Sequence, residues 1–183
     1  MTVTEIGMTL FDTTVGRCGV AWGERGLLAI LLPHSSDQGT VAALRRRVPA
    51  AREAIPPPAV QSAIDAMVAL LDGEPSDLSE VDLDLGTVPE FDRRVASSAR
   101  EIPPGETITY GELATRIDAP GEAREVGAAL GRNRFPLVVP CHRIVAADGR
   151  LGGFSAPGGT DTKRRLLAIE RRHAGGPLTL FDA

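Results

Sequence analysis

The sequence has few cysteines and no long apolar segment. Two cysteines, Cys18 and Cys141, lie far apart among 183 residues, which argues against a disulfide scaffold and fits a reducing cytoplasm. No apolar run approaches the roughly 20 residues needed to span a bilayer, so no membrane contact is expected. The segment from Met1 to Leu10 contains Glu5 and no basic residue, unlike a signal peptide. We therefore expect a cytoplasmic globular protein without internal repeats.

The charge is unevenly distributed along the chain. The formal net charge is −4, and the hydrophobic and charged contents, 43% and 24%, are ordinary for a globular protein. Residues 1–86 carry 6 Arg and 12 acidic residues, whereas residues 87–183 carry 13 Arg, one Lys and 12 acidic residues. Contact with phosphate is therefore expected from the second half. A solvated surface without any partner explains the asymmetry equally well.

Residues 1–86 are expected to form a small α/β unit. The expected elements are strands over residues 17–23 and 27–32, a turn at 24–26, and helices over residues 40–48 and 60–71. Three consecutive prolines separate the helices. Alternation over residues 81–85 predicts a half-exposed strand. Cys18 is expected to be a small buried side chain and His34 a loop residue, so nothing in this half indicates catalysis.

Two capping-box spacings mark helix starts in residues 87–183. Thr87 and Glu90 predict a helix that runs toward Ile102, and Thr109 and Glu112 predict a short helix that begins near Tyr110. A second short helix is expected over residues 122–130. Two short helices joined by a tight turn are the outline of a helix-turn-helix.

The second of these short helices is thin and carries a cation near its start. Ala123, Gly127, Ala128 and Ala129 keep its surface small, and Arg124 stands in its first turn. Such a helix can approach a nucleic-acid backbone closely. Tight packing of the small residues against a neighbouring helix is the alternative interpretation.

The stretch from Pro136 to Val145 contains the candidate nucleophile. An apolar, strand-like run with prolines along it leads to Cys141, and His142 follows directly. An ionised cysteine is a strong nucleophile, and a nearby imidazole can accept its proton. Adjacent side chains rarely point the same way, so we expect a water molecule between them. A buried structural cysteine is the alternative.

A carboxylate on a core-facing stripe extends this site. Four residues of a predicted helix fall at positions i, i+3, i+4 and i+7: Lys163, Leu166, Leu167 and Glu170. A buried carboxylate needs a partner, and it would fix the tautomer of a histidine. The pattern predicts a Glu170–His142–water–Cys141 relay. Alternatively, Glu170 extends into solvent. Between the two motifs, a glycine-rich loop around Phe154 can bring an aromatic ring and backbone N–H groups to a flat ligand.

Three motifs together carry a family resemblance. They are Ile102–Ala114, Arg124–Asn133 and Pro140-Cys141-His142-Arg143, the last being highly specific. From about Phe91 to Glu170 the chain resembles the O6-alkylguanine-DNA alkyltransferases, also called methylated-DNA–protein-cysteine methyltransferases. The resemblance implies an α/β, ribonuclease-H-like domain over residues 1–86, and a mostly α-helical domain over residues 87–183 with a (winged) helix-turn-helix.

The resemblance also implies a role for individual residues. The helix that carries Ala123 and Gly127 would lie in the minor groove of double-stranded DNA, with the O6-alkylguanine flipped out of the stack. Arg124 would fill the vacated stack, Tyr110 would press the flanking phosphate and donate to the base, and Phe154 would stack on it. Further contacts are implied for Ser155, as donor to the departing oxygen, for the carbonyls of Cys141 and Ile144, as acceptors from the exocyclic amine, and for Asn133, as brace of the active-site turn.

The implied reaction transfers the alkyl group to Cys141 once per molecule. It requires no cofactor, and the chain lacks the zinc ligands that some relatives carry, so no metal is expected; the protein would act as a monomer. Glu122 and Glu125 are unexpected on a DNA-binding helix, because they put negative charge on the helix that would face DNA. Two other classes compete. A non-catalytic binder of alkylated DNA would lack the cysteine, and a cysteine hydrolase would turn over without needing a thin helix led by Arg124.

Overall fold

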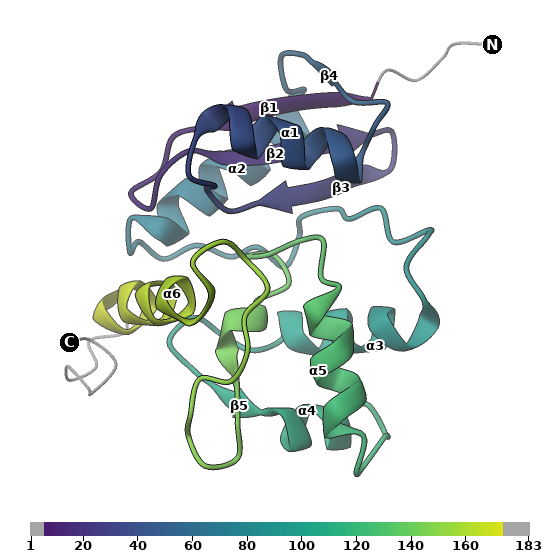
Figure 1. Ribbon diagram of the computed structural model, residues 1–183, viewed down its shortest axis with the longest axis vertical. Coiled ribbons are helices and arrows are strands. Elements are labelled where there is room, and N and C mark those ends of the chain that lie inside the picture. The colour runs from purple at the N-terminus through teal and green to yellow at the C-terminus, as the bar shows by residue number, and fades with distance from the viewer. Residues whose placement is uncertain (1–5, 174–183) are drawn as a thin grey trace.

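The first half of the chain builds a four-stranded sheet with the strand order β3-β2-β1-β4. The computed structural model describes residues 6–173. In it, β1, β2 and β3 pair antiparallel, and β4 pairs parallel to β1 (Figure 1). The strands are β1 (Gly7–Phe11), β2 (Cys18–Gly23), β3 (Gly26–Leu31) and β4 (Arg52–Glu53). The predicted hairpin at residues 17–32 is therefore present.

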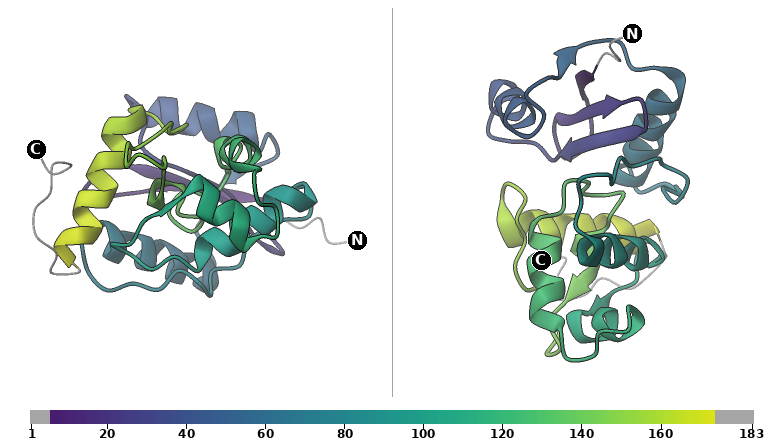
Figure 2. Two further views of the ribbon diagram at one scale, coloured as in Figure 1. Left: turned by 90° about the horizontal axis from the view of Figure 1, so that it is seen from below. Right: turned by 90° about the vertical axis from the view of Figure 1, so that its right-hand side faces the viewer.

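Two helices, α1 (Asp37–Arg47) and α2 (Pro58–Leu71), cover opposite faces of this sheet (Figure 2). Successive strand residues point to opposite faces. Ala21 therefore packs with the side chains of α1, whereas Val20 and Trp22 belong to the core that contains α2. α2 begins at a proline, whose fixed φ suits the first helical position. Both helices were predicted, although α1 starts three residues earlier, at Asp37, where the Ser36 side chain accepts from the N–H of Gly39.

The strand predicted over residues 81–85 is wrong in extent. Only Leu83 forms a β-bridge, with Leu27 at the start of β3. The alternation is correct, but the free edge of β3 is shared between two segments. Leu27 bonds to this segment, whereas the N–H of Ile30 donates to the carbonyl of Arg134 at 2.8 Å. Residues 81–85 therefore pair with β3 through a single β-bridge.

The second half is mostly helical. A two-stranded parallel sheet, β5–β6, lies among its helices (Figure 1). α4 and α5 pack against each other and both contact α3. The elements are α3 (Glu90–Arg100), β5 (Ile108–Thr109), α4 (Tyr110–Arg116), α5 (Ala123–Gly131), the 3₁₀ helix η1 (Cys141–Arg143), β6 (Ile144–Val145) and α6 (Gly159–His173).

Of the two predicted capping boxes, one is present. The Thr109 side chain accepts from the N–H of Glu112, and the Glu112 carboxylate accepts from the N–H of Thr109. The box predicted at Thr87 is wrong, because α3 starts only at Glu90, after Pro89. A residue before proline is kept out of the helical conformation, so Val88 cannot open the helix. The Glu90 carboxylate instead pairs with Arg93.

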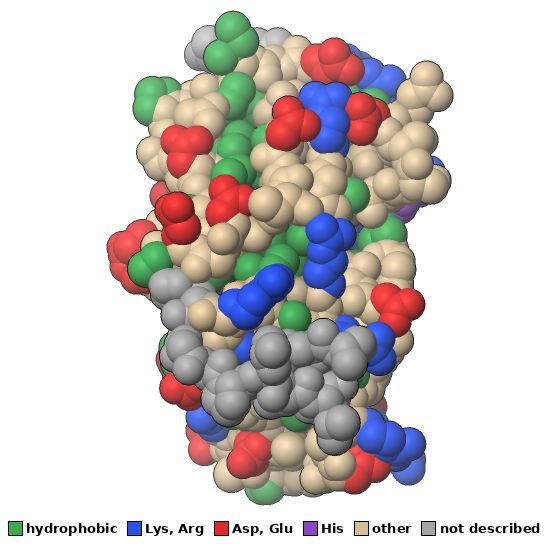
Figure 3. Space-filling view, turned by 90° about the vertical axis from the view of Figure 1, so that its left-hand side faces the viewer, with side chains coloured by type: hydrophobic (Ala, Val, Ile, Leu, Met, Phe, Trp, Pro, Cys, Tyr) green, Lys and Arg blue, Asp and Glu red, His purple; other side chains and the backbone are tan. Residues whose placement is uncertain are grey.

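One apolar core runs from the sheet into the helical half. Val20 and Met67 of the first half belong to the same cluster of buried residues as Val95 and Leu113 of the second. The division at residue 86 stays a prediction, and the outer ends of both predicted domains, residues 1–5 and 174–183, lie outside the described residues. No helix within residues 6–173 combines the length and apolarity that a membrane span requires. On the face drawn in Figure 3, acidic and basic side chains both occur outside the area drawn in grey.

Candidate active site around Cys141

Cys141 is held at the end of a tight turn rather than a strand. The predicted strand-like run over residues 136–140 is wrong, because these residues form turns and η1 begins at Cys141. Asn133 ties the turn together. Its Nδ2 donates to the carbonyl of Val139 at 2.9 Å, and its Oδ1 accepts from the N–H of Phe135 at 2.9 Å. Leu137 lies in the left-handed region at φ 75°, a strained conformation for this residue. The Asn133 bonds therefore hold the segment that positions the sulfur.

The thiol of Cys141 is almost fully buried, with 7% of the residue exposed. Burial raises its pKa, because a thiolate is poorly solvated there; the Asn133 side chain and the positive charge of Lys163 oppose this effect without outweighing it. The sulfur is thus a thiol at rest, and it needs a proton acceptor before it can act as a nucleophile.

His142 and Glu170 form the predicted buried pair. Nε2 of His142 lies 2.8 Å from Oε1 of Glu170, and both side chains are at most 2% exposed. The alternative in which Glu170 reaches solvent is wrong. Because the carboxylate accepts, Nε2 carries the hydrogen and Nδ1 keeps a free lone pair. Nδ1 is buried and has no hydrogen-bond partner among the described residues, so it is available as a base.

Arg143 completes this network and was missed as a site residue. Its Nε and Nη2 donate to Glu170 at 3.0 and 2.8 Å, and the N–H of Gly105 donates to Glu170 at 3.2 Å. Burial acts to raise the pKa of Glu170, but His142 and Arg143 outweigh it and hold that pKa at about 2. Glu170 is therefore an anion that both fixes His142 and neutralises a buried guanidinium. The sequence feature that could have identified Arg143 as a site residue is its position directly after His142.

Lys163 is the second residue that sequence reasoning left out of the site. It is fully buried, donates from Nζ to the carbonyl of Ile144 and lies 5.8 Å from the ring centroid of Tyr110. Burial lowers its pKa to about 8, against the attraction of Cys141. The pKa of Tyr110 is raised by burial and by Cys141, so its hydroxyl stays protonated. The helical stripe that predicted a buried Glu170 also contains Lys163. The same argument, that a charged side chain on a buried face needs a partner, applies to this lysine.

A cavity of about 750 Å³ gathers most of the predicted binding residues, and we call it the α5 cavity. Cys141 lies in its wall, so the side chain of this cysteine borders the cavity. The α5 face of the cavity is built from small side chains, and a Cβ added at Gly127 would lie 3.8 Å from the Tyr110 ring. The predicted residues in its wall are Tyr110, Ala123, Arg124, Gly127, Cys141, Phe154 and Ser155.

The small residues of α5 divide between two tasks. Ala129 is buried with Val126 and Leu130 on the side that faces the core, as the packing interpretation requires. Ala123 and Gly127 instead line the cavity beside Arg124, which is exposed. The thin face is therefore open rather than covered by a neighbouring helix.

The carbonyl of Ile144 already has one hydrogen-bond donor within the protein. This carbonyl, expected to accept from a ligand amine, accepts from Lys163 at 2.5 Å. A carbonyl has two lone pairs, so a second donor can still bind. Within residues 6–173, no three His, Cys, Asp or Glu side chains lie together as a metal site would require.

Known proteins resemble this chain in sequence and in fold. Residues 90–172 match the model of the 6-O-methylguanine DNA methyltransferase, DNA binding domain, family. The methylated-DNA–protein-cysteine methyltransferase of Mycolicibacterium paratuberculosis is 48% identical over 69% of this chain and 74% of that protein. The one of Methanothermobacter thermautotrophicus is 39% identical over 83% and 78%. The structure of Mycobacterium tuberculosis OGT in complex with DNA superposes with a TM-score of 0.74, at 33% identity, over 96% of this chain and 98% of that one.

Proposed function

Because this chain belongs to the methylated-DNA–protein-cysteine methyltransferase family, we propose that Cys141 is the cysteine that accepts the alkyl group. The protein is a direct-reversal DNA repair enzyme that consumes itself in one transfer. The observation that supports Cys141 is its position between an open cavity and a buried histidine–carboxylate pair. Its sulfur opens onto the α5 cavity, and His142, the next residue in the chain, is held in a buried pair by Glu170.

The transfer begins with removal of the thiol proton. Nδ1 of His142 accepts this proton through one water molecule, and Glu170 stabilises the imidazolium that forms. The thiolate sulfur then attacks the alkyl carbon in line with the bond to O6 of guanine. The S–C bond forms, the C–O6 bond breaks, and the electron pair moves onto the base. The thioether has no facile route back to a thiol, so each molecule acts once.

Tyr110 supplies the proton that neutralises the departing guanine. Its hydroxyl is protonated, because burial and the adjacent sulfur raise its pKa. Tyr110 regains a proton from the His142 imidazolium through water, so the proton lost by Cys141 balances the one gained by the base and no co-reactant is required. Lys163, beside the Tyr110 ring, favours the thiolate by its charge. Ser155 lies in the cavity wall where its backbone N–H can donate to the departing oxygen.

We infer that α4 and α5 act as a helix-turn-helix that presents the α5 cavity to double-stranded DNA. The argument is the open, thin face of α5 with Arg124 at its start. O6-alkylguanine must leave the stack to reach Cys141, since the sulfur lies inside the protein. Arg124 would then fill the gap in the duplex, and Phe154 would stack on the flipped base. The protein acts in this scheme as a cytoplasmic monomer.

A titration with duplex DNA that contains labelled O6-methylguanine tests this function. Transfer should saturate at one methyl group per protein, and Cys141→Ala should bind the duplex yet transfer none. Many products per protein would indicate a cysteine hydrolase instead. Binding by the intact protein without any transfer would indicate a binder of alkylated DNA, a class that the presence of Cys141 already disfavours.

A further inference from the structure

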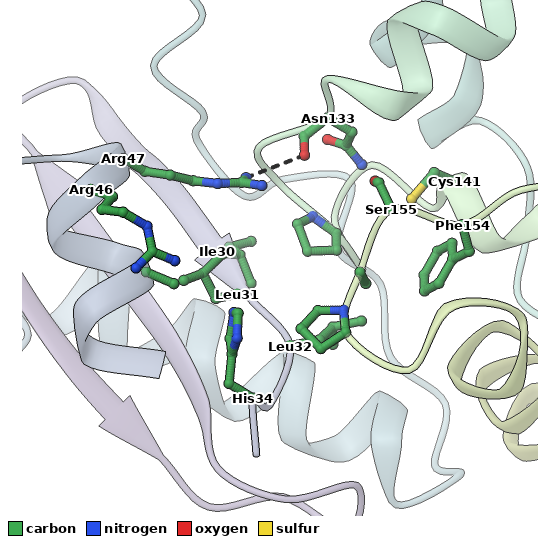
Figure 4. A pocket seen from close by; sticks show the side chains of 14 residues that line it. Ile30, Leu31, Leu32, His34, Arg46, Arg47, Asn133, Cys141, Phe154 and Ser155 are labelled. Carbon is green, nitrogen blue, oxygen red and sulfur yellow. Dashed lines mark hydrogen bonds between the residues drawn. The ribbon is translucent and has the colours of Figure 1, made fainter. Parts of the chain in front are cut away.

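A second cavity reaches the same sulfur from the side of α1. It has a volume of about 440 Å³, and we call it the α1 cavity. Cys141, Phe154 and Ser155 lie in the walls of both cavities, so the two spaces meet at the nucleophile. Figure 4 shows Cys141, Phe154 and Ser155 on one side of the α1 cavity, and His34, Arg46 and Arg47 on the other.

The α1 cavity carries positive charge without a matching acid. Its wall contains Arg46, Arg47 and His34 but no Asp or Glu, and within residues 6–173 no carboxylate forms an ion pair with either arginine. Burial and repulsion from both arginines lower the pKa of His34. Arg47 is held toward the active-site turn by its bond to the Asn133 carbonyl at 3.4 Å (Figure 4). The rest of the wall is mainly apolar, with Leu32 and Pro136 among its residues.

The geometry of the transfer explains why a second space beside the sulfur matters. In an in-line displacement the sulfur, the transferred carbon and O6 lie on one axis, and the other substituents of that carbon point sideways. A methyl group has only hydrogens there, but a longer alkyl group must place the rest of its chain beside the sulfur. The α5 cavity then holds the base, so the adjoining α1 cavity is the space that remains.

We propose that the α1 cavity is a subsite for O6-alkyl groups with an anionic end, whose chain lies on the apolar wall and whose charge faces Arg46 and Arg47. This inference rests on the proposed function and names a substrate class for the same site. The reaction is unchanged: the S–C bond forms, the C–O6 bond breaks, and the substituent stays on Cys141. A neutral substituent of equal size would gain the apolar contact but not the attraction.

Matched substrates isolate the charge. We would measure single-turnover rates with oligonucleotides that contain O6-(3-carboxypropyl)guanine or its carboxamide, which have nearly the same size and differ in charge. The carboxylate should react about three- to tenfold faster, as expected for one partly screened charge interaction. The preference should shrink in Arg46→Gln, where Arg47 remains, and it should also shrink at high salt. Arg45→Gln is the control, because Arg45 lies next in the chain but lines neither cavity and faces Glu53 at 3.8 Å.

Two outcomes would overturn the subsite. Equal rates for carboxylate and carboxamide in the unchanged protein would mean that the arginines do not sense the substituent. An equal slowing of both substrates by Arg46→Gln would mean that this arginine contacts the DNA backbone instead. O6-methylguanine serves as the reference substrate. If it too fails to react with the unchanged protein, the proposed function is wrong, and the experiment separates that failure from failure of the subsite.

Discussion

Replacing Glu170 by glutamine tests the buried hydrogen-bond network beside Cys141. The carboxylate accepts hydrogen bonds from His142, Arg143 and Gly105, and its residue is 3% exposed. Glutamine keeps the shape but removes the charge. Arg143 then remains as a buried cation without an anion, and the amide no longer requires a hydrogen on Nε2 of His142. Both the stability and the rate of transfer should therefore fall.

The expected size of both effects follows from the same contacts. The pKa of Glu170 is about 2, against an ordinary 4.5, which corresponds to roughly 3 kcal/mol of folding free energy at neutral pH. Because the folded pKa is the lower one, this contribution is complete above about pH 4.5 and is lost as the pH falls toward 2. Loss of a correctly protonated base costs about a hundredfold or more in rate.

Urea unfolding and single-turnover transfer from an O6-methylguanine duplex measure the two effects separately. Asp92→Asn is the control, since Asp92 accepts two bonds from Arg132 at 2.9 and 2.8 Å but lies outside both cavities at Cys141. It should lose stability and keep the transfer rate. The reasoning is refuted if folded Glu170→Gln transfers methyl at the normal rate with an unchanged pH profile.

Three further predictions concern Arg124 in the wall of the α5 cavity and two residues that contact Tyr110, which also lines it. Gly152→Ala should slow transfer about tenfold, because the backbone has φ +71° and the added Cβ would lie 3.1 Å from the Tyr110 hydroxyl. In the control Gly153→Ala the added Cβ meets no atom within 4 Å, so this variant should react normally. Equal rates for the two variants would contradict this reasoning. Arg124→Ala should react normally with free O6-alkylguanine but at least about tenfold more slowly with duplex DNA, and a normal duplex rate would exclude its role. Between pH 8 and 10.5, where the unfolded chain holds the extra proton on Lys163, the unfolding free energy of the unchanged protein should rise by roughly 3 kcal/mol relative to that of Lys163→Met; a difference between the two proteins that stays constant with pH in urea titrations would contradict the buried cation.

Signals confined to a few neighbouring residues predicted the structure well. The capping box at Thr109 and Glu112 forms as expected, because both partners lie within one helical turn. Periodicity placed Glu170 on the buried face of α6 for the same reason. The capping box at Thr87 failed for a local reason, Pro89, but the predicted strand failed because a distant segment decides the outcome. The strand over residues 81–85 shrinks to one bridge because Arg134 takes the neighbouring position on β3.

The site shows the same limit. The sequence pairs His142 with Glu170, but it does not show that Arg143 also donates to the carbonyl of Ile102, 41 positions away. Likewise, nothing local indicates that Lys163 reaches the carbonyl of Ile144. The α1 cavity forms because α1 lies against the active-site turn. No local sequence motif could therefore have identified Arg46 and Arg47 as residues of a cavity.

The most direct test of the account is the intact mass of the protein after it has been mixed with an oligonucleotide that contains O6-methylguanine. We expect every active molecule to gain one methyl group in place of one hydrogen, with fragmentation locating it on Cys141. A protein that keeps Cys141 as a free thiol after prolonged incubation, or that carries the methyl group on another residue, would contradict the central claim.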